Sequence, residues 1–67
     1  METLSGLRQK LGLTQKELHE KTGIPMSSIA MYEIGERMPS LKRAKKLAKF
    51  FEVPIEEIAF GKKVHNE

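Results

Sequence analysis

The sequence lacks cysteine entirely and has only three prolines among its 67 residues. Without cysteine, neither a disulfide framework nor a thiolate zinc site can stabilise the fold. A chain this short buries only about 60% of the surface that its unfolded form exposes, so helix packing has to supply the stability. The length therefore indicates one small domain, without room for a substrate pocket flanked by two walls of structure.

Long apolar runs are also missing. No run approaches the roughly 20 residues that a membrane span needs, and the N-terminus lacks the basic-then-apolar pattern of a signal peptide. Together with the absence of cysteine, this composition predicts a soluble, cytoplasmic protein that makes no contact with membranes.

The residue types of catalysis do not form a recognisable pattern. There is no Ser/His/Asp constellation, phosphate-binding loop or metal-ligand spacing. Glu56 and Glu57 are adjacent, so their carboxylates diverge on a helix. His19 could be joined as a metal ligand only by His65, near the end of the chain. We therefore expect neither an enzyme nor a binder of metals, cofactors or small-molecule substrates.

The charge leans towards polyanionic partners, because the formal net charge is +3. Its distribution is more informative than its size. The stretch over residues 37–51 has no acidic residue and six cations: Arg37, Lys42, Arg43, Lys45, Lys46 and Lys49. This run is either a solvated helix face or part of a surface that faces nucleic-acid phosphates.

Glycines and prolines divide the chain at regular intervals into stretches with helical apolar spacing. These stretches predict five short helices, over residues 3–11, 15–22, 26–34, 41–51 and 54–61. No window alternates strictly between apolar and polar residues, so no strand is expected. The predicted fold class is all-α: a compact five-helix domain over residues 1–61, followed by a polar tail over residues 62–67.

The second helix has the strongest start signal. Thr14 precedes it and Glu17 follows three residues later, which is the spacing of a capping box. Leu13 and Leu18 are placed to form a hydrophobic staple across this cap. Ser40 is the expected cap of the fourth helix.

The inward faces follow from the 3.6-residue period. On the first helix the expected face is Leu4, Leu7 and Leu11. On the fourth it is Leu41, Ala44, Leu47, Ala48 and Phe51, and on the fifth it is Ile55 and Ile58.

The second and third helices, joined by a tight turn at residues 23–25, have the form of a helix-turn-helix unit. Here the chain resembles the Cro and lambda-type phage repressor domains, also called the xenobiotic-response-element family, over about residues 4–58. The matching residues are Leu7-Arg8, Leu13-Thr14-Gln15-Lys16-Glu17-Leu18, Gly23-Ile24, Ser28-Ile29, Tyr32-Glu33, Gly35, Pro39-Ser40-Leu41, Leu47-Ala48 and Phe51-Glu52-Val53.

The resemblance implies that the third helix reads bases from the DNA major groove. The implied base-reading residues are Met26, Ser27 and Met31, with Ser28 and Ala30 beside them. None of them can make a bidentate contact to a base, so apolar contact to a thymine methyl is the expected role of methionine. The alternative is that Met26 and Met31 only fill gaps in the core.

The resemblance also implies a phosphate contact and an ion pair. Gln15 corresponds to the family's phosphate-clamping glutamine, unless it is merely an exposed residue at a helix start. Arg8 and Glu33 correspond to a buried ion pair, unless they are two unrelated surface charges. The other expected phosphate neighbours are cations: Lys10, Lys16, Arg37, Lys42 and Arg43.

Two positions depart from the family pattern. Ile34 stands where asparagine is frequent, and His19 stands where alanine is usual, at the close approach of the second and third helices. His19 would either widen that crossing or point to solvent. Dimerisation is expected to use Phe50, Ile55 and Phe60, because the two phenylalanines do not both fit the inward stripe.

These observations predict a dimeric, sequence-specific binder of double-stranded DNA that recognises an inverted-repeat operator and represses transcription, as in a phage or mobile element. Two alternatives remain. The first is an antitoxin or a restriction-modification controller of the same fold. The second is a helix-turn-helix module that binds proteins, since fold alone does not determine function.

Overall fold

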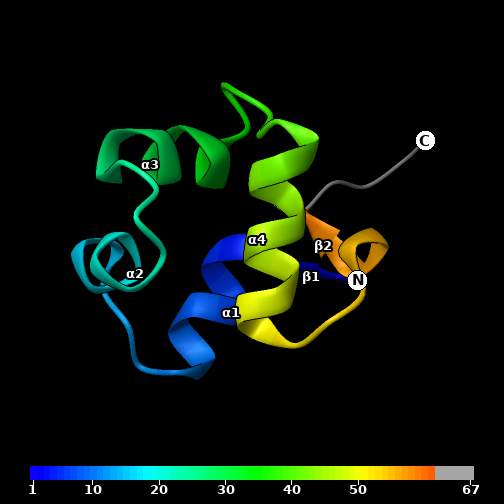
Figure 1. The fold of residues 1–67 in the computed structure, drawn as a ribbon, viewed down its shortest axis with the longest axis horizontal. Helices are drawn as coiled ribbons and strands as arrows, with labels where there is room; N and C mark the ends of the chain where they lie inside the picture. The colour runs from blue at the N-terminus through cyan, green and yellow to red at the C-terminus, as the bar shows by residue number, and fades with distance from the viewer. Residues whose placement is uncertain (62–67) are drawn as a thin grey trace.

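The computed structural model describes residues 1–61, which form four α-helices, one 3₁₀ turn and two very short strands. In chain order the elements are β1 (Glu2–Thr3), α1 (Leu4–Lys10), α2 (Gln15–Thr22), α3 (Met26–Ile34), α4 (Leu41–Phe51), η1 (Ile55–Glu57) and β2 (Ile58–Ala59). Figure 1 shows α3 above α1 and α2, with α4 alongside them. The first four predicted helices are confirmed.

The predicted helix caps are also confirmed. The Thr14 hydroxyl accepts a hydrogen bond from the Glu17 amide at 3.0 Å, and the Glu17 carboxylate accepts one from the Thr14 amide at 2.8 Å. Ser40 caps α4 by accepting from the amide of Arg43 at 3.2 Å. These side chains satisfy backbone donors that have no partner within the helix, so both helix starts are encoded locally.

Two leucines assigned to inward faces lie outside instead. Leu11 is 57% exposed and Leu41 is 64% exposed. Leu11 comes after the last residue of α1, so the helical period no longer holds it on the buried face. Leu41 is the first residue of α4, and the buried face of that helix begins one turn later, at Ala44.

The predicted fifth helix is wrong, and so is the expectation that no strand forms. Residues 55–57 make a single 3₁₀ turn, and β2 then pairs in parallel with β1, Glu2 opposite Ile58. A helix this short restricts many backbone dihedrals for few hydrogen bonds, whereas β1 provides ready partners. Strands of two residues are too short to leave an alternation pattern in the sequence.

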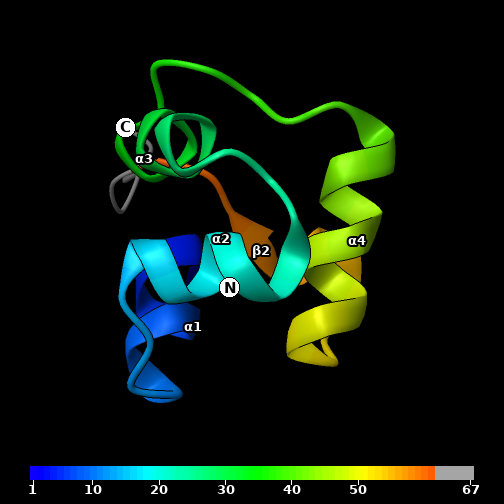
Figure 2. The same cartoon turned by 60° about the vertical axis from the view of Figure 1, so that its left-hand side comes forward.

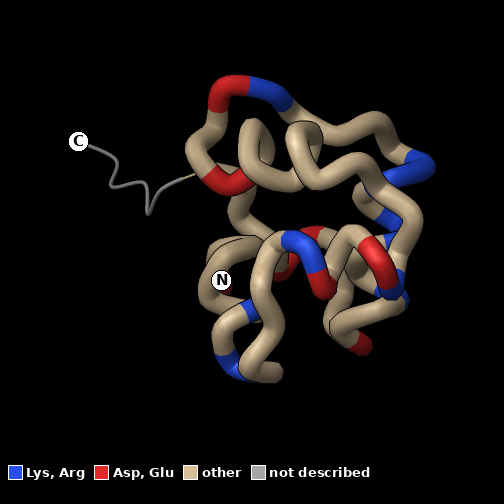
Figure 3. The backbone as a smooth tube through the Cα atoms, turned by 90° about the vertical axis from the view of Figure 1, so that its left-hand side faces the viewer, with Lys and Arg blue, Asp and Glu red and all other residues tan. Residues whose placement is uncertain are grey.

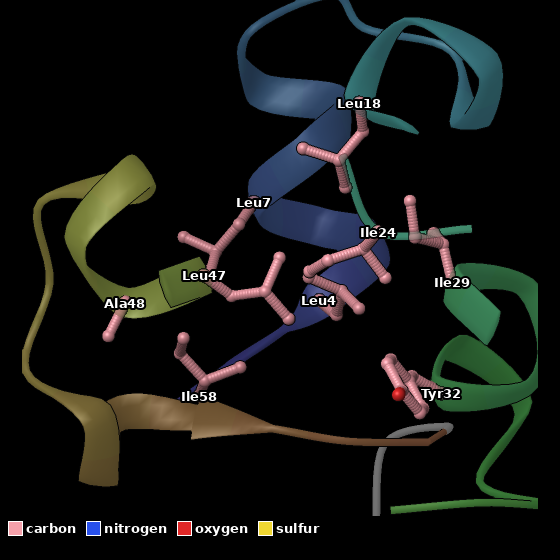
Figure 4. Close-up of a cluster of buried hydrophobic side chains, with 9 residues drawn as sticks. All are labelled: Leu4, Leu7, Leu18, Ile24, Ile29, Tyr32, Leu47, Ala48 and Ile58. Carbon is pink, nitrogen blue, oxygen red and sulfur yellow. The ribbon is translucent and has the colours of Figure 1, made fainter. Parts of the chain in front are cut away.

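The core lies where α1, α2, α3, α4 and β2 converge (Figure 4). Each of the four helices contributes one fully buried large side chain: Leu4, Leu18, Ile29 and Leu47. The other buried members are Leu7, Ile24, Tyr32, Ala48 and Ile58. Leu13, beside the cap of α2, packs against this cluster, to which Leu18 belongs, and the direct staple contact between the two leucines stays a prediction.

The end of α3 touches the chain beyond β2 through two glycines. Gly35 and Gly61 both have positive φ, and a Cβ on Gly35 would lie 3.2 Å from the Cα of Gly61. Gly12 also has positive φ, at +69°, but no atom lies within 4 Å of its would-be Cβ. An alanine at Gly12 would therefore suffer backbone strain alone, whereas an alanine at Gly35 would suffer both strain and a steric clash.

Gly35→Ala should destabilise the fold more than Gly12→Ala. Both variants place alanine in the left-handed region, at a cost of about 1–2 kcal/mol. Gly35→Ala adds overpacking against backbone, for which about 1–3 kcal/mol is typical. Chemical denaturation of the two variants measures the difference, and equal losses of unfolding free energy would show that the Gly35–Gly61 contact is loose.

Candidate nucleic-acid interface

The turn between α2 and α3 is held by hydrogen bonds that bracket Gly23. Gly23 takes the left-handed conformation, with φ at +78°, and its amide donates to the carbonyl of His19 at 2.7 Å. The buried Thr22 hydroxyl donates to the Leu18 carbonyl at 2.8 Å and accepts from the Ile24 amide at 3.2 Å. These bonds join two short helices at a defined angle, which is the structural requirement of a helix-turn-helix unit.

His19 belongs to the same turn. Its Nδ1 lies 2.8 Å from the carbonyl oxygen of Ile24, and the side chain is half-buried. Of the two alternatives for His19, pointing to solvent is wrong, because the ring bonds to the backbone of the turn. Within residues 1–61, no three His, Cys, Asp or Glu side chains are grouped to hold a metal ion. His65 lies outside the described residues.

Arg8 and Glu33 form the ion pair that the sequence predicts. Arg8 Nε lies 2.6 Å from Glu33 Oε2, Nη2 donates to Oε1 at 3.1 Å, and Nη1 donates to the Leu13 carbonyl at 2.7 Å. The hydrogen bond to Glu33 raises the pKa of Arg8, the carboxylate charge adds to that effect, and burial opposes it. The pair ties α1 to the last turn of α3.

Gln15 is not a free residue at a helix start. Its amide nitrogen donates to Glu33 Oε1 at 2.9 Å, and the side chain is half-buried. A glutamine amide carries two N–H groups, so one can bond to Glu33 while the other remains for a further acceptor. Glu33 thus orients Gln15 at the N-terminus of α2, and the phosphate contact itself remains a prediction.

The two faces of α3 differ in exposure. Ile29, Tyr32 and Glu33 are buried, and the residues of the other face are exposed or half-exposed. Met26 is 45% exposed, so its assignment to the core is wrong. The implied base-reading residues on this outer face are Met26 and Ser27, which are exposed, and Ser28, Ala30 and Met31, which are half-buried. Ile34 is exposed at the end of the helix.

An open hollow of about 230 Å³ lies beside the outer face of α3. Its lining residues are Ser27, Ser28 and Met31 from the helix and Arg37 from the connection to α4. Met31 therefore borders the surface and is not part of the buried cluster. The hollow combines two hydroxyls, a guanidinium and a thioether, which suit contacts to hydrogen-bond acceptors and to apolar groups on base edges.

The expected phosphate neighbours occupy different environments. Lys16, Arg37 and Lys42 are exposed, as such a role requires. Lys10 is also exposed, but its ammonium lies 2.6 Å from a carboxylate oxygen of Glu2. The end of α1 that carries Lys10 lies on the opposite side of the molecule from α3 (Figures 1 and 2). The cationic positions of α4 descend one flank of the molecule (Figure 3).

Arg43 has a role that its position in the basic run did not reveal. Its Nη1 donates to the Tyr32 hydroxyl at 2.9 Å and to Ser28 Oγ at 3.3 Å, so it bridges α4 to α3. Neither Tyr32 nor this bridge was predicted. The available signal was the tyrosine itself, because a buried tyrosine in an apolar stripe needs a partner for its hydroxyl.

The three residues assigned to dimerisation pack against the core. Phe50 meets Phe51 edge-to-face with ring centroids 5.0 Å apart, and Phe60 meets Tyr32 in the same way at 6.4 Å. Both phenylalanines and Ile55 are half-buried against the buried cluster. The premise that Phe50 and Phe60 do not both fit inside is therefore wrong, while their outer edges remain accessible.

Taken together, the two joined helices, the fixed turn and the outer face of α3 define a helix-turn-helix DNA-binding domain. The family model described as helix-turn-helix matches residues 4–58, and the chain belongs to this Cro-type family of DNA-binding transcriptional regulators, which are not enzymes. Within residues 1–61, no helix has the length and apolarity to cross a bilayer.

Proteins of similar sequence agree with this assignment. An uncharacterised helix-turn-helix regulator of Methanocaldococcus jannaschii is 50% identical over 46 residues, which cover 69% of this chain and 70% of that protein. The cryptic phage CTXphi transcriptional repressor RstR of Vibrio cholerae is 32% identical, covering 85% of this chain and 51% of RstR. The transcriptional activator BcrR of Enterococcus faecalis is 33% identical, covering 94% of this chain and 31% of BcrR. No solved structure matches the chain.

Proposed function

We propose that this regulator binds an inverted-repeat operator as a homodimer and represses transcription by occupying the DNA. The observation that supports this proposal is the outer face of α3. Five of its first six side chains are exposed or half-exposed: Met26, Ser27, Ser28, Ala30 and Met31. The opposite face is anchored by the Arg8–Glu33 pair. A helix held in this way can enter a major groove about 12 Å wide and present its N-terminal half to the bases.

Repression is the proposed outcome because a dimer on two half-sites covers about one or two DNA turns and excludes polymerase from them. RstR, a relative of this chain, is named a repressor, whereas BcrR is named an activator. The dimer contact is proposed to involve the accessible edges of Phe50, Ile55 and Phe60. A reporter assay distinguishes repression from activation directly.

Selection from random duplex DNA tests the proposal. We expect an inverted repeat whose half-site centres are about 10 base pairs apart, with affinity at least roughly 10³-fold above that for unrelated duplex. Inserting five base pairs between the half-sites rotates one by half a turn and should abolish two-chain binding in sedimentation. A reporter with the operator across its promoter should be silenced. Selection of a direct repeat, or activation of the reporter, would contradict the proposal.

Met31 and Gln15 should affect DNA binding differently. Met31→Ala should weaken binding to the selected operator by about 1–3 kcal/mol and spare unrelated duplex, because Met31 lines the hollow beside α3. Gln15→Ala should weaken both alike, because phosphates carry no sequence information. The measurement is the ratio of specific to non-specific affinity at one salt concentration, with thermal melts as the folding control. A ratio that Met31→Ala leaves unchanged would remove Met31 from base reading.

A further inference from the structure

We infer that Arg43 is a positioning residue that turns the Ser28 hydroxyl hydrogen away from its own guanidinium, towards the N7 of a guanine in the operator. This inference rests on the proposed base-reading role of α3 and specifies its chemistry at one position. It follows from the directions of hydrogen bonds among α3, α4 and the helix-turn-helix turn.

The first step is the placement of the guanidinium. Arg43 is the third residue of α4, where the Ser40 cap holds its backbone amide. From there its Nη1 reaches both Tyr32 and Ser28, which lie four residues apart on one side of α3. Tyr32 is buried, so the contact at 2.9 Å anchors the guanidinium beside the recognition helix.

The second step is the direction of the bond to Ser28. A guanidinium has five N–H donors and no acceptor, so Ser28 Oγ can only accept from it. The hydroxyl hydrogen of Ser28 must then point to an acceptor elsewhere. Serine within a helix often donates to the carbonyl four residues earlier. For Ser28 that carbonyl belongs to Ile24. Within residues 1–61 it accepts from the ring of His19 at 2.8 Å, and the Ser28 hydroxyl does not donate to it.

Within residues 1–61, the structure provides no acceptor for the Ser28 hydroxyl hydrogen. The side chain also borders the open hollow that contains Ser27, Met31 and Arg37. A hydroxyl in this position can satisfy its donor only with water or with a ligand in the hollow. On DNA, the ligand is a base edge or a phosphate oxygen.

The third step is the choice of base. In the major groove, guanine presents two acceptors, N7 and O6, and no donor, whereas thymine presents one acceptor beside a methyl group. Cytosine and adenine each present an amino donor. A free serine hydroxyl tolerates either kind of group. A hydroxyl that already accepts from Arg43, and whose hydrogen points away from that guanidinium, favours an edge with acceptors and no donor. Guanine offers two acceptors where thymine offers one, so the Ser28–Arg43 pair favours guanine, with N7 as the partner of the hydroxyl.

Operators with single 7-deazaguanine substitutions test the inference, because this analogue removes N7 and keeps Watson–Crick pairing. Dissociation constants are measured for the full chain at one salt concentration. For the wild type, one guanine per half-site should lose about two- to tenfold in affinity on substitution, the effect of a single neutral hydrogen bond. Ser28→Ala should bind the two operators equally, whereas Ser27→Ala should still discriminate between them.

Arg43 is tested with a variant matched in charge. Arg43→Gln and Lys42→Gln each remove one positive charge from the first turn of α4, so both should weaken binding overall. Only Arg43→Gln should abolish the sensitivity to 7-deazaguanine, because glutamine offers an acceptor that releases the Ser28 hydroxyl. Arg43→Lys, which again has only donors, should restore it. Thermal melts of each variant report on folding.

Three results would overturn the inference, and they differ from failure of the proposed function. These results are equal binding of substituted and natural operators by the wild type, discrimination that survives Ser28→Ala, and identical behaviour of Arg43→Gln and Lys42→Gln. If no duplex is preferred over another, the proposed sequence-specific function fails instead.

Discussion

Glu33→Leu alone should reduce the free energy of unfolding by about 3–5 kcal/mol, which is a large share of the stability of a domain this small. Glu33 is only 8% exposed, and it accepts from Arg8 and from Gln15. Its removal leaves the Arg8 guanidinium partly buried without its counter-charge. Arg8→Met should be similarly costly, because it also removes the hydrogen bond that Arg8 donates to the Leu13 carbonyl.

The double variant Arg8→Met, Glu33→Leu should be less destabilised than the sum of the two single variants. Apolar residues of similar volume recover packing without the desolvation of two charges. The exposed pair Lys10–Glu2, also 2.6 Å apart, is the matched control. Its double-mutant cycle should give only about 0.2–1 kcal/mol. Strict additivity at Arg8 and Glu33 in chemical denaturation would mean that the two residues are not coupled.

Binding to the operator should weaken by about 10³–10⁵ when the salt concentration rises from 50 to 200 mM, the range for six to ten neutralised phosphates. A dimer offers this number of contacts if each chain contributes most of its candidate cations. The cations on the side of α3 are Lys16, Arg37, Lys42 and Arg43. Affinity that is flat over this range would exclude a phosphate-dominated interface.

The slope of log affinity against log salt concentration also shows which lysines contact phosphates. Lys42→Gln removes one phosphate contact per chain, which should reduce the log–log slope by about 2 per dimer. Lys10→Gln should leave the slope unchanged, because Lys10 is paired with Glu2 at the end of α1 away from α3. A reduced slope for Lys10→Gln would place the DNA across a different face.

The ends of the helices were predictable because they depend on residues close together in the sequence. The capping box of Thr14 and Glu17 joins residues three apart, and the left-handed glycines end α2 and α3. The spacing alone brings these groups together, whatever surrounds them. The ion pair between Arg8 and Glu33 is 25 residues apart, and it was predictable only through the resemblance to a known family.

The tertiary structure decided contacts for which the sequence carries no spacing rule. Parallel pairing of β1 with β2 replaces the expected last helix. This pairing joins residues more than 50 positions apart, so no local pattern in the sequence predicts it. Gln15 turns to Glu33 and Arg43 turns to Ser28 only because α2, α3 and α4 meet at particular angles.

The amino-acid sequence by itself thus determined the first four helices, the caps of α2 and α4, and the mostly helical class of fold. Those properties depend on local hydrogen bonds and on apolar periodicity, which short windows of sequence encode. Packing decided which polar side chains are already bonded within the protein and which hydroxyl is left to donate. The reason is that a hydrogen bond between distant residues requires its two atoms within about 3 Å, and only the folded chain sets that distance.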